Sequence, residues 1–130
     1  MASKYIALPK GISEQTFDAA VRDFSRVLGD DAVLTAPERL APYIKTMMPV
    51  PDSEHTLSAA LMATTVEQIQ KILAVCNKYK IPIWTISTGK NLGYGSAAPA
   101  ERGQVVLDLK RMNRILEVDK DLAYALVEPG

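Results

Sequence analysis

The chain has 130 residues, 48% of them apolar and 23% charged, which is the composition of a globular domain. Its 15 basic and 15 acidic residues balance, so net charge gives no reason to expect nucleic acid or an anionic membrane as a partner. A single cysteine and a single histidine argue against an internal disulfide and a Cys/His zinc cluster. There is neither an apolar run of roughly 18 residues nor an export-signal pattern, so we expect a soluble protein.

Residues 1–56 are predicted to form an extended arm, one helix and an irregular segment. Ser13 is a suitable helix N-cap, and Gly29 is a typical stop. Between them, apolar residues recur at the spacing of an amphipathic helix, namely Phe17, Ala20, Val21, Phe24, Val27 and Leu28. A short β segment is expected at 33–35, and repeated prolines keep 36–56 mostly irregular, with at most a single helical turn.

Residues 57–130 are predicted to begin with a strand, a helix and a second strand. The apolar run 57–63 fits a buried strand, and Thr65 with Gln68 forms a capping box for the helix. The apolar face of this helix is predicted to contain Val66, Ile69, Ile72, Leu73 and Cys76. The next strand, 83–86, should run parallel to the first through a right-handed crossover.

The rest of the chain is predicted to be rich in β structure. A strand is expected at 104–109, and segments 114–118 and 122–128 are expected to form a hairpin. A strand–helix–strand start joined to antiparallel strands indicates an α+β fold with a mixed sheet. No internal repeat suggests a different architecture.

A glycine-rich stretch at 87–99, directly after the predicted strand 83–86, is the strongest functional signal. Its three glycines within seven residues let the backbone approach a ligand, and consecutive N–H groups can then bind phosphate oxygens. It is not a P-loop, because Trp84 and Asn91 stand where that motif needs Gly and Ser or Thr. It is not a Rossmann turn, because Pro99 and the following strand prevent the helix that such a turn opens.

This stretch resembles the phosphate loop of the vanillyl-alcohol oxidase and 4-cresol dehydrogenase (p-cresol methylhydroxylase) flavoproteins, and is most similar to the cresol-dehydrogenase branch. The resemblance extends over nearly the whole chain, through Leu8-Pro9-Lys10-Gly11, Tyr43, Met47-Met48-Pro49, Arg102-Gly103-Gln104-Val105 and Val127-Glu128-Pro129-Gly130. It implies that 57–130 is the first part of a PCMH-type FAD-binding domain. That domain and a substrate-binding cap are expected to continue beyond residue 130.

The resemblance also implies roles for single residues. The FAD-binding residues that it implies are Ser87, Thr88, Gly89, Lys90, Asn91, Gly93, Gly95 and Ser96. For Lys90, a solvated lysine at the shoulder of the loop is the alternative. Tyr94 is expected to be catalytic, with its hydroxyl donating to the phenolic oxygen of the substrate. The alternative for Tyr94 is a ring packed beneath the loop.

The activity implied by the resemblance is FAD-dependent dehydrogenation and hydration of para-alkylphenols such as 4-cresol to 4-hydroxybenzyl alcohols, through a quinone methide. FAD is expected to be attached covalently through a residue beyond 130, with a c-type cytochrome subunit as electron acceptor. A homodimer of the flavoprotein in the periplasm is expected, with the cytoplasm as the alternative location. The alternatives are a vanillyl-alcohol or eugenol type of oxidase that uses O₂, and a nucleotide-binding module or inactive fragment if the chain ends at residue 130.

Two further residues are interpreted without a catalytic role. A histidine in the corresponding early region of vanillyl-alcohol oxidase assists flavin attachment. The sequence around His55 departs from that pattern, so His55 is interpreted as a surface loop residue. Cys76 lies on the apolar face of its predicted helix and is interpreted as a small buried hydrophobe.

Overall fold

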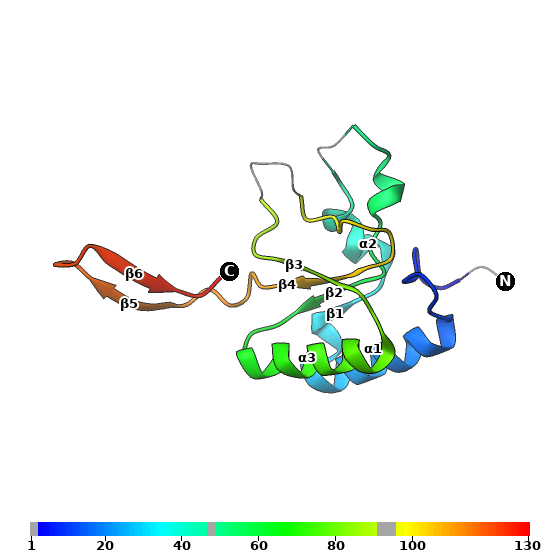
Figure 1. Ribbon diagram of the computed structural model, residues 1–130, viewed down its shortest axis with the longest axis horizontal. Coiled ribbons are helices and arrows are strands. Elements are labelled where there is room, and N and C mark those ends of the chain that lie inside the picture. Colours follow the sequence, from blue (N-terminus) through cyan, green and yellow to red (C-terminus); the bar gives the residue numbers. More distant parts are fainter. Residues whose placement is uncertain (1–2, 47–48, 91–95) are drawn as a thin grey trace.

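A four-stranded sheet forms the centre of the fold, and a separate antiparallel hairpin projects from one end of it (Figure 1). The computed structural model describes residues 3–46, 49–90 and 96–130. The elements in chain order are α1 (Glu14–Leu28), η1 (Asp30–Ala32), β1 (Val33–Leu34), α2 (Pro37–Leu40), η2 (Ala41–Tyr43), η3 (Asp52–His55), β2 (Ala59–Met62), α3 (Val66–Tyr79), β3 (Ile83–Ile86), β4 (Val105–Asp108), β5 (Ile115–Asp119) and β6 (Tyr124–Val127).

The strand order is β1-β2-β4-β3, so the last strand of this sheet in sequence lies between β2 and β3. β1 runs antiparallel to β2, whereas β2 and β3 both run parallel to β4. The predicted mixed sheet is therefore confirmed, although its antiparallel member is β1 rather than the hairpin. The two strands joined by α3 share a direction but do not pair. All four residues of β4 are buried, which suits the centre of a parallel sheet covered on both faces.

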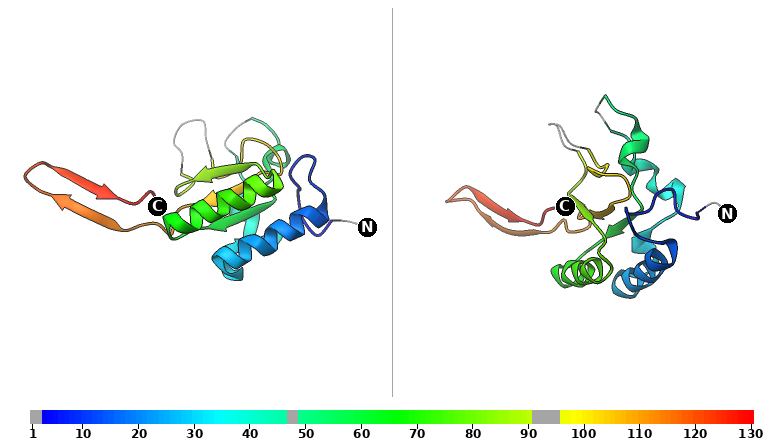
Figure 2. Two further views of the ribbon diagram at one scale, coloured as in Figure 1. Left: turned by 60° about the horizontal axis from the view of Figure 1, so that its bottom comes forward. Right: turned by 45° about the vertical axis from the view of Figure 1, so that its right-hand side comes forward.

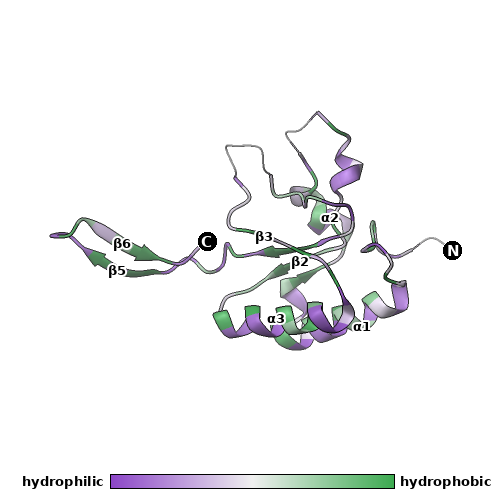
Figure 3. Cartoon of the chain, viewed as in Figure 1, coloured by the Kyte–Doolittle hydropathy of each residue, from purple (hydrophilic) through white to green (hydrophobic). Residues whose placement is uncertain are grey.

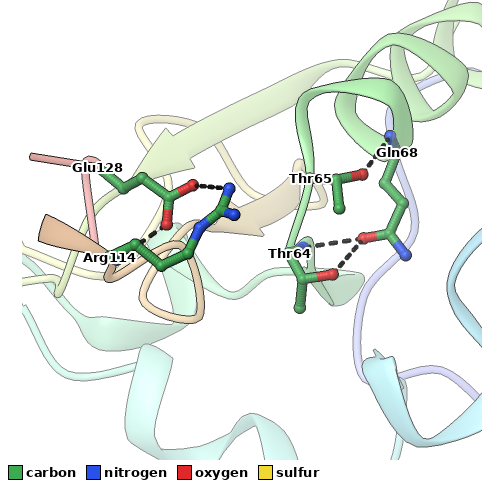
Figure 4. A network of polar contacts seen from close by, with 5 residues as sticks. All are labelled: Thr64, Thr65, Gln68, Arg114 and Glu128. Carbon is green, nitrogen blue, oxygen red and sulfur yellow. Dashed lines mark hydrogen bonds and ion pairs between the residues drawn. The ribbon is translucent and has the colours of Figure 1, made fainter. Parts of the chain in front are cut away.

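The capping signals at the start of the helices are present in the structure. Ser13 Oγ accepts a hydrogen bond of 3.1 Å from Thr16 N, and α1 ends at Gly29 with φ 84°. In α3, Thr65 Oγ1 accepts from Gln68 N at 3.2 Å. Gln68 Oε1 then accepts from the backbone and hydroxyl of the preceding Thr64, so the capping box closes one residue earlier than predicted (Figure 4).

The apolar face predicted for α3 is partly wrong. Val66 and Leu73 are 55% and 41% exposed. The residues of α3 that contact the core are Ile69, Ile72, Val75, Cys76 and Tyr79. Helical spacing allows both sets, and the position of α1 beside α3 decides which of the two is covered. Cys76, at 5% exposure, is a small buried hydrophobe as predicted.

Two apolar layers enclose the sheet. α1 and α3 lie side by side on one face, and α2 lies on the other (Figure 2). Asp23 of α1 ties the two long helices together, because it accepts from Lys78 Nζ at 2.9 Å and from Tyr79 Oη at 2.8 Å. The segments before and after residue 57 share one core, since β1 pairs with β2. Within the described residues, no helix is long and apolar enough to cross a membrane.

The hairpin formed by β5 and β6 carries apolar residues on both strands, with the acidic Glu117 and Asp119 among them on β5 (Figure 3). Its large apolar side chains are exposed, with Ile115 at 70%, Val118 at 69% and Leu122 at 73%. A two-stranded ribbon on its own is marginally stable in water, so the contacts at its base decide where it lies.

Candidate cofactor site

The glycine-rich loop leaves the sheet at the carboxyl ends of its parallel strands. It begins directly after β3, and Ile86 at the end of β3 is in register with Asp108 at the end of β4 and, through it, with Met62 at the end of β2. Ligands of α/β sheets bind outside the carboxyl ends of the strands. A ligand of this sheet would therefore be expected at the edge where the glycine loop begins.

The two ends of the glycine loop, here called its shoulders, are residues 87–90 before the undescribed segment and residues 96–99 after it, and they are in close contact. Gly89 has φ +71°, and a Cβ at this position would lie 2.8 Å from the Cβ of Ala97. Only glycine fits such an approach without displacing its neighbour. On the far shoulder, Ser96 Oγ accepts from Ala98 N at 3.2 Å, and Ala98 and Pro99 are buried. The loop is thus anchored at both ends on the sheet.

The structure describes five of the nine residues predicted for the site. Ser87, Thr88 and Lys90 are exposed, and Gly89 and Ser96 are half-buried. The others, Asn91, Gly93, Tyr94 and Gly95, lie outside the described residues. The contact between Gly89 and Ala97 brings residues 87–90 close to Ser96. The roles proposed for Tyr94 and the other three residues stay predictions.

Ser87 has a partner that the sequence did not indicate. Its hydroxyl donates to the carbonyl oxygen of Pro129, in the segment that follows β6. The chain therefore returns to the start of the loop after it has formed the hairpin. No local pattern links two residues this far apart in the sequence.

His55 is more than a surface residue, in contrast to its interpretation from sequence. It is half-buried in η3, and its Nδ1 lies 2.8 Å from the carbonyl oxygen of Pro99. This contact joins η3 to the far shoulder of the glycine loop. It positions the backbone of the loop from outside.

A buried polar cluster lies at the same edge of the sheet and was missed by the sequence analysis. Asp108 is only 1% exposed, and its Oδ2 accepts from Tyr43 Oη at 2.6 Å and pairs with Lys110 Nζ at 2.9 Å. Lys110 also donates its backbone N–H to Asp108 Oδ1 at 2.9 Å. One signal could have indicated it: an aspartate directly after the buried run Val105–Leu107 needs partners in the interior.

The cluster shifts the ionisation of its members. Burial, and then the hydrogen bond to Asp108, raises the pKa of the Tyr43 hydroxyl. Burial lowers the pKa of Lys110, but its hydrogen bonds to Asp108 and Tyr43 outweigh burial, so the pKa is raised overall. Both partners therefore keep their protons at neutral pH. Because the Lys110 ammonium group is paired with Asp108, we do not expect Lys110 to bind an anionic ligand. The candidate groups for anion binding are those of the glycine loop.

The described residues fit a pyrophosphate group. The close approach of Gly89 to Ala97 has no room for a side chain, and the neighbouring residues Thr88 and Lys90 are exposed and carry side-chain donors. Among the residues that the structure describes, no group of three or more His, Cys, Asp or Glu side chains could hold a metal ion. The chemistry of the donor set is that of anion binding.

Comparison with known families agrees with this site. Residues 57–130, more than half of the chain, match the family described as FAD binding domain. The chain belongs to this FAD-binding family. The glycine loop and the returning segment at Pro129 both lie within the matched residues.

Among curated proteins, the chain is 58% identical to the 4-cresol dehydrogenase [hydroxylating] flavoprotein subunit of Pseudomonas putida, over 95% of this chain and 24% of that protein. The structure matches that of p-cresol methylhydroxylase with substrate bound, with a TM-score of 0.93 at 58% identity, and 95% and 24% of the two chains covered. It also matches 4-ethylphenol oxidase from Gulosibacter chungangensis, with a TM-score of 0.89 at 40% identity and the same coverage. The chain thus spans about a quarter of the length of each of these relatives.

Proposed function

We propose that this chain supplies the first part of the FAD domain of a flavoprotein that dehydrogenates and hydrates para-alkylphenols. The observation that carries the proposal is the 58% identity over 95% of the chain to a 4-cresol dehydrogenase flavoprotein subunit. Identity of this extent includes the glycine loop and its surroundings. The start of the loop directly after β3, at the carboxyl edge of the sheet, supports binding of a ligand there.

FAD would be held by its pyrophosphate at the glycine loop. Backbone N–H groups around Gly89, the side chains of Thr88, Lys90 and Ser96, and the predicted donors Asn91, Gly93 and Gly95 would provide the contacts. Bound FAD supplies the two-electron oxidation of the benzylic carbon. Tyr94 would donate a hydrogen bond from its hydroxyl to the phenolate oxygen, keep its own proton, and so stabilise the substrate in its ionised form. Loss of a hydride from the benzylic carbon of the phenolate would leave a quinone methide, and addition of water to that carbon would give the 4-hydroxybenzyl alcohol.

The test is anaerobic reduction of the purified intact protein by 4-cresol. We expect loss of the oxidised flavin absorption on mixing and formation of 4-hydroxybenzyl alcohol in the presence of an artificial electron acceptor. A matched control uses toluene, which lacks the phenolic oxygen and should leave the flavin oxidised. Purified protein without flavin, or flavin that 4-cresol does not reduce, would contradict the proposal.

The electron acceptor separates this proposal from a second candidate function. The similarity to 4-ethylphenol oxidase, at 40% identity, supports a variant of the activity that uses O₂. We favour a c-type cytochrome subunit, because the more similar relative is itself named a flavoprotein subunit. Reduced protein should then reoxidise slowly in air and quickly with a c-type cytochrome. Fast consumption of O₂ would favour the oxidase.

We further propose a periplasmic homodimer with FAD attached covalently through a residue beyond 130. The support is the same similarity to the cresol-dehydrogenase subunit. Acid precipitation should leave the flavin with the protein pellet if the bond is covalent. Flavin that is released into the supernatant would contradict that part of the proposal.

A further inference from the structure

The hydroxyl of Ser87 is engaged by a segment from the other end of the chain. Ser87 directly follows β3, and its hydroxyl donates to the carbonyl oxygen of Pro129. A serine hydroxyl has one proton, and phosphate oxygens in FAD are acceptors. While Ser87 donates to Pro129, it cannot also donate to a pyrophosphate oxygen.

The segment that Ser87 contacts is fixed closely against the sheet edge. Gly130 donates its N–H to the carbonyl oxygen of Met112 at 2.7 Å. A Cβ at Gly130 would lie 2.5 Å from the carbonyl oxygen of Leu109, so no other residue fits there without displacing the backbone. Leu109 in turn donates to the carbonyl oxygen of Ile86 at 2.9 Å, which joins this turn to the end of β3.

An ion pair closes the base of the hairpin beside this segment. Arg114 donates its backbone N–H to Glu128 Oε2 at 2.9 Å and its Nη2 to Glu128 Oε1 at 2.6 Å (Figure 4). Glu128 N also donates to the carbonyl oxygen of Arg114 at 2.9 Å. The chain therefore leaves the sheet edge at 112–114, forms the hairpin and returns to the same edge at 128–130. Ser87 is the contact between this return and the glycine loop.

We propose that Ser87 is a positioning residue whose hydroxyl fixes the Pro129–Gly130 segment against the start of the glycine loop, so that backbone N–H groups rather than this hydroxyl meet the pyrophosphate. The second half of this statement rests on the proposed FAD function, and the first half does not. The contact sets where the chain after the hairpin starts relative to the cofactor site. This positioning role replaces the FAD-binding role that the resemblance alone implies for the Ser87 side chain.

The test measures amide hydrogen exchange in the intact protein without FAD. In Ser87→Ala, exchange of the Gly130 amide should become roughly fivefold to tenfold faster, because the segment loses one of the bonds that hold it. Ser87→Thr keeps a hydroxyl and should restore the slow exchange. Amides of β4 serve as an internal reference for folding, and Ser53→Ala, which deletes an exposed hydroxyl elsewhere, should leave Gly130 unchanged.

Unchanged exchange at Gly130 in Ser87→Ala, or faster exchange that Ser87→Thr does not restore, would overturn the proposal. FAD binding to the same variants tests the second half. In flavin-free protein, before any covalent bond to the flavin forms, we expect the dissociation constant for FAD to rise less than about threefold in Ser87→Ala, whereas loss of a bond to a charged phosphate would raise it about tenfold or more. Failure of every variant and of the parent protein to bind FAD would contradict the proposed function but would leave the exchange result to decide on Ser87.

Discussion

Tyr43 and Tyr124 each donate a hydrogen bond from the hydroxyl to a carboxylate, but the first bond is buried and the second is exposed. A buried partner left unsatisfied costs more than one that water can solvate. We therefore expect Tyr43→Phe to lower the free energy of unfolding by about 1–3 kcal/mol and Tyr124→Phe to leave it nearly unchanged. Urea unfolding followed by fluorescence of Trp84, the single tryptophan, measures both. Equal effects would show that the Asp108 cluster does not stabilise the sheet edge.

Tyr94 is the residue on which the proposed chemistry depends most. If its hydroxyl holds the phenolate, Tyr94→Phe should slow anaerobic reduction by 4-cresol by roughly 10²-fold, the usual effect of losing one donor to an anion in a dry site. The flavin content should be unchanged. Tyr79→Phe is the matched control, because Tyr79 donates to Asp23 on the helical face. A normal rate per bound flavin in Tyr94→Phe would exclude this role.

The contacts of single residues were the least predictable part of the site. Tyr43 and Asp108 are 65 residues apart in sequence, and Ser87 and Pro129 are 42 apart. Such contacts follow from the order of strands, which hydrophobic periodicity does not contain. The loop itself was predictable, because glycine spacing is a local signal. Its position at the carboxyl edge followed from the strand before it.

At the scale of elements, local sequence signals predicted where the helices and strands lie, but they did not predict how these elements pack together. α1 and α3 start at the predicted caps, and the apolar runs around β2 and β4 form strands. The position of β4 between β2 and β3 was not predicted, because the sequence of a strand does not specify which other strands it pairs with.

The base of the hairpin should respond to acid. Arg114 holds the pKa of Glu128 below its usual value, so the stabilisation from this pair is present above that value and is lost as pH falls through the pKa of the folded state. The NMR shift of the Arg114 amide, which donates to Glu128, should therefore be constant near pH 7 and should change below about pH 4.5. Glu128→Gln should abolish this change. A shift that titrates identically in Glu128→Gln would mean that another group causes it.

At the scale of the molecule, the hairpin exposes apolar side chains on a ribbon with unpaired edges. The 130-residue chain prepared alone is expected to self-associate through it. Val118→Lys places a charge at a side chain that is 69% exposed and should shift size-exclusion elution toward the monomer. Leu73→Lys on α3, at a side chain that is 41% exposed, is the control and should leave association unchanged. Equal elution of Val118→Lys and the parent chain would place the contact elsewhere.

The strand order also has a consequence for synthesis. β3 leaves the ribosome before β4, yet among the described strands β3 pairs with β4 alone. β2 has only its short antiparallel partner β1 until then. Every parallel pair of the sheet therefore waits for residues 105–108 to emerge, and during that interval the apolar faces of α1 and α3 have no complete sheet to cover. We expect a nascent chain stalled between β3 and β4 to expose these apolar faces and to bind chaperones more than one stalled after β4.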